Sequence, residues 1–222
     1  MNLLQVRTYV RTLLDEDTAA FWSDAQINEF INRSFMTVYT QIAQSQRGYF
    51  ETTGNITYVA GTELYSLATM APLGFIRLSL LERVDQPPNQ TLLPIDISEK
   101  NDYAQVPGEG DTMGYEKYFM SGNNLGIAPV PQVNITNVLK VWYVPVPAKL
   151  VLDADVFPAD LTEVHHECIA QGAYMRCCQR DKQLLAIVVP VYKDLLDLCK
   201  ADTQIRIGQE PRRVIDTDKN WS

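Results

Sequence analysis

The sequence predicts an α+β protein with a four-helix core, built from one helical pair at each end of the chain, and an antiparallel β domain inserted between the pairs. Apolar residues recur every three or four positions near both ends, and they alternate with polar residues in the middle. Neither helical pair can bury its apolar face alone, so the two pairs are expected to pack together. The predicted regions are 1–48 (helical pair), 49–150 (β region), 151–207 (helical pair) and 208–222 (extended tail).

Two helices are expected before residue 49. Asn2 can cap the first, which runs to about Leu14. The second covers residues 23–46 and has an unusually clear start, because Ser23 and Gln26 have the spacing of a capping box. Its apolar stripe predicts a buried spine for the core.

The middle of the chain has the two-residue period of β-strands. Residues 56–67, with a turn at 60–62, indicate a β-hairpin. Residues 98–105 predict one or two helical turns within a stretch of weak pattern. The remaining strands are expected at 75–84, 116–120, 125–128 and 138–144.

A third helix is expected from residue 161 to about Gln179. Asp160 and Glu163 have the spacing of a capping box at its start. Gly172 and Ala173 are small enough to let a neighbouring helix come close.

The fourth helix is expected to begin after an Asp181 cap and to run to about Arg206. Pro190 lies inside this span and removes a backbone hydrogen bond, so the helix should kink or begin there. Gly208 is expected to end it.

The composition is that of an ordinary globular chain, with 222 residues, 46% of them hydrophobic, and a net charge of −8. This charge argues against a protein that grips phosphates by sequence-independent attraction. Arg7 and Arg11 interrupt the apolar residues near the start, so we expect no signal peptide or membrane span and a cytosolic chain. The cysteines show no disulfide framework and are expected to be reduced: Cys168, Cys177, Cys178 and Cys199.

No segment has the spacing of a convincing active site, and we expect no cofactor and no metal. His165, His166 and Cys168 are the nearest approach to a metal site or a Cys–His nucleophile. Adjacent histidines on a helix point in different directions, and a cysteine inside a helix is more often a small core residue. Residues 108–110 are glycine-rich but lack the Lys-Ser or Lys-Thr of a phosphate-binding loop.

Several phrases, in their order along the chain, resemble the head–tail adaptor (connector) proteins of tailed bacteriophages. The first is Phe-Trp-Ser-Asp-Ala-Gln-Ile at 21–27, which leads into Phe-Ile-Asn at 30–32. The others are the hairpin and Leu-Gly-Ile-Ala-Pro-Val-Pro at 118–131, Leu-Lys-Val-Trp-Tyr at 139–143, and Phe-Pro-Ala-Asp at 157–160. Together they span most of the chain. The stretch 86–114 and Pro190 depart from a compact version of the family.

The resemblance implies a non-enzymatic virion protein, made in the host cytoplasm and placed in the neck between the portal and the tail. Such proteins form a homo-oligomeric ring, commonly of twelve subunits, whose channel passes DNA without sequence-specific binding. The partners implied are the portal protein and tail or nozzle proteins, with no membrane.

In that family the C-terminal segment reaches into the portal. Carried to this chain, the portal-binding residues would be Arg212, Arg213, Val214, Ile215 and Trp221. Two alternatives remain open at this point. One is a tail or neck completion protein that binds tail subunits, and the other is an intracellular Cys/His enzyme.

Overall fold

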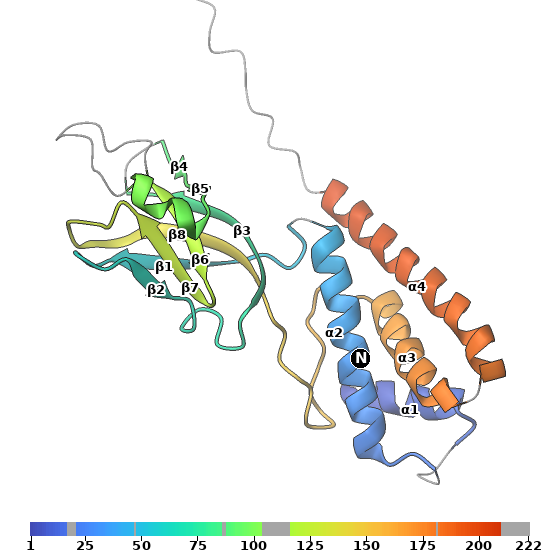
Figure 1. Ribbon diagram of the computed structural model, residues 1–222. Coiled ribbons are helices and arrows are strands. Elements are labelled where there is room, and N and C mark those ends of the chain that lie inside the picture. The colour runs from blue at the N-terminus through green and yellow to red at the C-terminus, as the bar shows by residue number, and fades with distance from the viewer. Residues whose placement is uncertain (17–20, 47, 86–87, 104–115, 181, 210–222) are drawn as a thin grey trace, which may run out of the picture. The chain divides into compact units, whose positions relative to one another are not determined.

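The computed structural model describes residues 1–16, 21–46, 48–85, 88–103, 116–180 and 182–209. The chain divides into two compact units, here called the helical unit (Met1–Tyr49 with Lys149–Ser222) and the β unit (Phe50–Ala148). The helical unit therefore joins both ends of the chain, and the β unit is an insertion between them (Figure 1).

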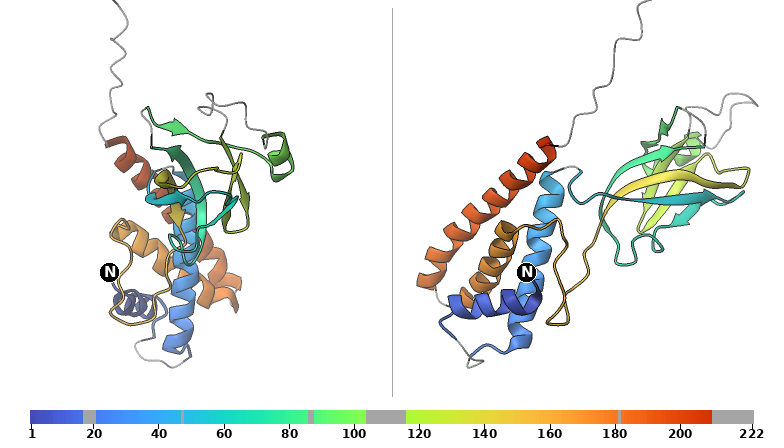
Figure 2. Two further views of the ribbon diagram at one scale, coloured as in Figure 1. Left: turned by 90° about the vertical axis from the view of Figure 1, so that its left-hand side faces the viewer. Right: turned by 180° about the vertical axis from the view of Figure 1, so that it is seen from behind.

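Four helices from the two ends of the chain form the core of the helical unit, as the sequence predicted. Helix α3 packs against the other three helices. Figures 1 and 2 show α2, α3 and α4 side by side, with α1 crossing near the start of α2. The helices are α1 (Leu3–Leu13), α2 (Asp24–Ser45), α3 (Glu163–Cys177) and α4 (Lys182–Gln209), with a 3-10 turn at Cys178–Arg180.

Side chains cap both N-terminal helices at their first turns. The Asn2 side chain accepts from the Gln5 backbone N–H at 2.9 Å, and Ser23 Oγ accepts from Gln26 N–H at 3.3 Å. The stripe that follows Ser23 is buried: Ile27, Ile31, Phe35, Val38 and Ile42. Helix α2 thus supplies the apolar spine of the core.

Helix α3 begins two residues later than its expected Asp160 cap. Its N-cap is Thr162, whose backbone N–H donates to His165 Nδ1 at 3.0 Å. Asp160 lies instead in a turn closed by the Leu161 N–H and the Pro158 carbonyl, and its own carbonyl accepts from the Tyr49 hydroxyl. A histidine at the third helical position has taken the role that the sequence assigned to Glu163.

Helix α4 neither begins at Pro190 nor ends at Gly208, because it runs unbroken from Lys182 to Gln209. Pro190 lies on the exposed side of the helix, where Ala186 is also exposed. Water can therefore hydrate the carbonyl that the proline leaves without a donor. The expected Asp181 cap lies outside the described residues.

Gly172 is the point of closest approach between three helices. A Cβ at this position would lie 2.2 Å from Ser34 Oγ of α2 and 2.8 Å from the Tyr192 ring of α4. The prediction that Gly172 admits a neighbouring helix is confirmed, and it admits two.

The β unit contains two four-stranded sheets, with strand orders β1-β8-β3-β4 and β2-β7-β6-β5. A 3-10 helix at Ile97–Tyr103 occupies the place of the expected helical turns. The strands are β1 (Thr52–Tyr58), β2 (Leu64–Ser66), β3 (Phe75–Arg83), β4 (Gln90–Thr91), β5 (Leu93–Pro94), β6 (Lys117–Ser121), β7 (Asn124–Ala128) and β8 (Ile135–Pro145).

The prediction of a β-hairpin over residues 56–67 is wrong. Strand β1 pairs with β8 in one sheet, whereas β2 pairs with β7 in the other, so the turn between β1 and β2 carries the chain from sheet to sheet. Tyr58 and Tyr65 lie on either side of this turn, and both side chains belong to the buried core. Their ring centroids lie 6.0 Å apart. Burial of these rings in a shared core has outweighed local pairing.

The pairing of β6 with β7 is the antiparallel hairpin that the sequence predicted. The predicted antiparallel character holds for the other pairs except β5 with β6, which is a short parallel contact. Among the described residues, no helix combines enough length and apolar character to cross a bilayer.

Candidate interaction surface

The five residues expected to bind the portal lie beyond the described part of the chain. They are Arg212, Arg213, Val214, Ile215 and Trp221, and α4 ends at Gln209, just before them. The segment expected to begin at Gly208 therefore starts with two residues that belong to α4.

The two histidines of α3 serve packing and capping. Burial, and next the nearby N-terminal ammonium, lowers the pKa of His166 to about 4, so its ring is neutral at pH 7. The His166 ring packs against Phe157 at 5.2 Å, and His165 Nδ1 accepts from the Thr162 backbone.

The cysteines nearby are buried thiols. A hydrogen bond with Cys199, and then burial, raises the pKa of Cys168, and burial raises the pKa of Cys177 to about 12. A protonated thiol is a poor nucleophile and a poor metal ligand. Nowhere in the described ranges do three or more His, Cys, Asp or Glu side chains gather in a way that could hold a metal ion.

Two arginines of α1, almost fully buried, connect the start of the chain to distant segments. Arg7 donates two hydrogen bonds to Asp153, at 2.8 and 3.0 Å, and Arg11 forms ion pairs with Asp24 and Glu16. The hydrogen bond from Arg11 is the main reason that the pKa of Asp24 lies below its ordinary value. These bidentate and charge-assisted contacts fix α1 against α2 and against the loop before α3.

Hydrogen bonds to its backbone hold that loop, residues 150–156, at several points. The Asn32 side chain of α2 bonds both backbone groups of Leu150, at 2.9 and 2.8 Å, and this pair is buried. The Asp155 carboxylate accepts from the backbone N–H groups of Val151 and Leu152, at 2.6 and 2.8 Å.

Helix α1 holds the other end of the loop. The backbone N–H groups of Leu3 and Leu4 donate to the carbonyls of Asp155 and Asp153, at 2.9 and 3.2 Å. Asn2 also forms an antiparallel bridge with Val156. The first turn of α1 thus uses otherwise unpaired N–H groups to fix this loop.

Most of the side chains that this loop turns to solvent are apolar, although the Asp153 side chain between them is 55% exposed. Val151 is 74% exposed, Leu152 66% and Val156 67%. Met1 and Leu4 beside them are also exposed, and we call these five residues the loop patch. A rigid backbone that holds neighbouring aliphatic side chains outward is typical of a contact surface rather than of a flexible loop.

A second exposed apolar surface lies on α4. Residues 184–192 (Leu-Leu-Ala-Ile-Val-Val-Pro-Val-Tyr) contain no charged side chain. Val188 faces the core, but Ile187 is 68% exposed. We call the solvent-facing residues the α4 face: Ala186, Ile187, Pro190 and Val191.

Sequence reasoning missed both surfaces. In the loop patch, the signal was three aliphatic residues placed among Asp153 and Asp155 in the segment between β8 and α3. In α4, it was the nine-residue apolar run at 184–192. Periodicity predicted that α4 has a buried face but did not show that the opposite face is also apolar.

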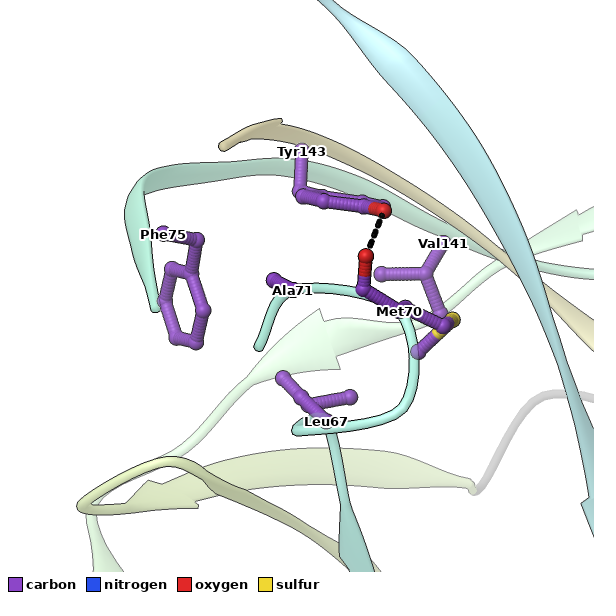
Figure 3. A pocket seen from close by; sticks show the side chains of 6 residues that line it. All are labelled: Leu67, Met70, Ala71, Phe75, Val141 and Tyr143. Carbon is purple, nitrogen blue, oxygen red and sulfur yellow. Dashed lines mark hydrogen bonds between the residues drawn. The ribbon is translucent and has the colours of Figure 1, made fainter. Parts of the chain in front are cut away.

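The β unit contains a small hollow with no reactive group around it (Figure 3). At this hollow, the Tyr143 hydroxyl donates a hydrogen bond to the Met70 carbonyl at 2.8 Å. Met70 also covers Gly54, where a Cβ would lie 2.1 Å from its sulfur. The lining is otherwise apolar core: Leu67, Met70, Ala71, Phe75, Val141 and Tyr143.

A charged cluster of the β unit also has a structural explanation. Arg83 pairs with Asp85 and Glu116, at 2.7 and 2.6 Å, and Tyr58 donates to Glu116 at 3.0 Å. Burial raises the pKa of Glu116 despite the nearby guanidinium. The cluster ties the start of β6 to β1 and β3.

Comparison with known proteins gives one family. The model of the family described as SU10 adaptor protein matches residues 1–213 of this chain. A search of curated proteins gave no match.

Proposed function

The chain belongs to the SU10 adaptor protein family, a family of phage head–tail adaptors, and from this premise we propose that it forms a ring that joins the portal to the tail. The observation that carries the proposal is the family match, which covers both helical segments and the whole β unit. The family is one of structural adaptor proteins.

The proposed ring contains several copies of this chain, with twelve as the expected number, and its channel continues the path of DNA from the capsid. The net charge of −8 supports this role, because an acidic wall repels phosphates and lets DNA slide. In the virion the ring occupies the neck, after assembly in the host cytoplasm.

We further propose that residues 210–222 bind the portal. Arg212 and Arg213 supply charge, and Val214, Ile215 and Trp221 supply apolar anchors of the kind that dominate binding energy. The segment directly follows α4, so a fixed helix would present it to the partner.

Truncation after Gln209 tests this assignment. The truncated chain keeps every described helix and strand, so its circular dichroism and thermal transition should match the full chain, while its binding to purified portal protein should be lost. The matched control is residues 210–222 fused to an unrelated carrier, which should compete with the full chain for the portal. Unchanged portal affinity after truncation would overturn the proposal.

The alternative of a tail or neck completion protein keeps the virion location but changes the partner. It would be favoured by binding to tail or nozzle proteins in the absence of portal binding. The Cys/His enzyme receives no support from the capping role of His165, the neutral ring of His166 or the protonated thiols of Cys168 and Cys177.

A further inference from the structure

The α4 face has a composition that helices normally bury. A helix that is apolar around its whole circumference belongs in a core or in an interface, because its outer side would otherwise remain in contact with water. Residues 184–192 are uncharged on all sides, yet Ile187 is 68% exposed. Some surface must therefore cover α4 in the assembled protein.

The loop patch cannot cover the α4 face of the same molecule. Helix α1 and its loop pack on one side of α2 and α3, and α4 packs on the other (Figures 1 and 2). The two apolar surfaces thus lie on opposite flanks of one helical unit. This arrangement suits contact between copies, because each copy offers one surface of each kind.

One complementary pair of charges lies beside the two surfaces. Exposed Lys182 and Lys193 flank the apolar run of α4. In the loop patch, Asp153 is already paired with Arg7 of its own chain. The Asp155 carboxylate accepts from the Val151 and Leu152 backbone, and these hydrogen bonds keep the pKa of Asp155 below its ordinary value. Docking would bring an ammonium group beside the α4 face toward the Asp155 carboxylate at the edge of an apolar centre.

We propose that the α4 face of one subunit docks on the loop patch of the next, in a head-to-tail contact between copies of this chain. A contact between two different surfaces is heterologous, and it closes into a ring when the rotation per subunit permits. The inference rests on the proposed ring and names the surfaces that build it. It does not depend on portal binding.

Two single substitutions test the contact, each in one surface. Ile187→Glu and Leu152→Glu place a carboxylate at an exposed apolar position, so both variants should fold with the thermal transition of the wild type. Each alone should self-associate at least roughly 30-fold more weakly, the size expected for loss of a central anchor. The matched controls, Gln204→Glu on α4 and Leu73→Glu in the β unit, should assemble as the wild type does in analytical ultracentrifugation.

Mixing the two variants gives a sharper result. Each retains one intact surface, so the α4 face of the Leu152→Glu variant can dock on the loop patch of the Ile187→Glu variant. The mixture should form a heterodimer and stop there, although each variant alone stays monomeric. A mixture that remains monomeric, or single variants that assemble normally, would overturn the proposal.

Cross-linking covers the case in which the free chain associates weakly. Chains with Ile187→Cys and Leu152→Cys, carrying different tags, should form a mixed disulfide at millimolar concentration under mild oxidation, and a Leu73→Cys control should not. Absence of the mixed product would contradict the contact. If the variants lose portal binding but keep self-association, the α4 face or the loop patch belongs to the portal, and the inference fails. If they lose self-association but the wild type does not bind the portal, the proposed function fails and this inference stands.

Discussion

The helical unit and the β unit differ in how they expose apolar side chains. In the helical unit, most of the large exposed aliphatic residues gather on the loop patch and on one apolar run of α4, and Leu198 lies outside both. In the β unit they are scattered over separate strands, turns and the 3-10 helix, at Val59, Leu64, Leu73, Leu93, Ile97 and Val133. Scattered surface hydrophobics are ordinary, whereas neighbouring ones mark contact surfaces. The difference supports our proposal that the helical unit makes the contacts between subunits.

The two units also close their cores differently. The β unit is one continuous stretch, Phe50–Ala148, with its own buried cluster. The helical unit needs segments from both ends of the chain, joined by buried polar contacts such as Asn32 with Leu150. Substitutions in one core should therefore leave the other core folded, and the predictions below test this independence.

The largest effect is expected in the β unit. Phe119→Ala removes a buried ring that covers Gly126, where a Cβ would lie 2.2 Å from the ring. The cavity should lower the free energy of unfolding of the β unit by about 4 kcal/mol. Hydrogen exchange should show loss of protection in β6 and β7 but not in α2 and α3. Equal loss in both units would show that they unfold as one.

The reciprocal change in the helical unit is Gly172→Val. The added side chain meets Ser34 and Tyr192 at less than contact distance, so the three helices must separate, at a cost of about 3 kcal/mol. Ala25→Leu, at an exposed position of α2, is the matched control and should cost little. Chemical denaturation followed by helical circular dichroism measures both. A tolerated valine would contradict the close helix packing.

A smaller effect is expected from Asn32→Ala, which removes both side-chain hydrogen bonds to Leu150. The buried backbone groups lose their partner, so the helical unit should lose about 2 kcal/mol. Because the same bonds fix the loop patch, self-association should weaken even though no exposed residue has changed. Ultracentrifugation and denaturation of one sample separate the two effects, and unchanged association would mean that the loop patch needs no such support.

The smallest effect is a difference in response to acid. The pKa of His166 is lowered to about 4, so the stability that its neutral ring contributes is present above pH 6.5 and is lost as the pH falls from 6.5 through 4. The pKa of Glu116 is raised above 4.5, so its contribution to the β unit has the opposite sign and increases as the pH falls through that raised pKa toward 4.5.

Hydrogen exchange at a series of pH values should show the helical unit weakening before the β unit. His166→Gln should flatten the response of the helical unit, and Glu116→Gln should flatten that of the β unit. If both units of the wild type lose stability over the same pH range, and these variants behave in the same way, His166 and Glu116 are excluded as the cause.

The sequence predicted the helical unit better than the β unit, for physical reasons. Periods of 3.6 and local capping pairs are encoded within a few residues, as for α2 and Ser23. Strand partners are set by distant segments, so β1 and β2 were wrongly joined as a hairpin. The prediction that Asp160 caps α3 was wrong because Asp160 lies in the turn that precedes the helix. The loop patch depends on contacts between α1 and residues far along the chain, which no local pattern encodes.

The most direct test of the adaptor assignment is the mass and shape of this chain, alone and with purified portal protein, by light scattering and negative-stain imaging. The account predicts a ring of this chain on one end of the portal, with neighbouring helical units in contact. A chain that stays monomeric beside the portal, with no particle containing both, would contradict it.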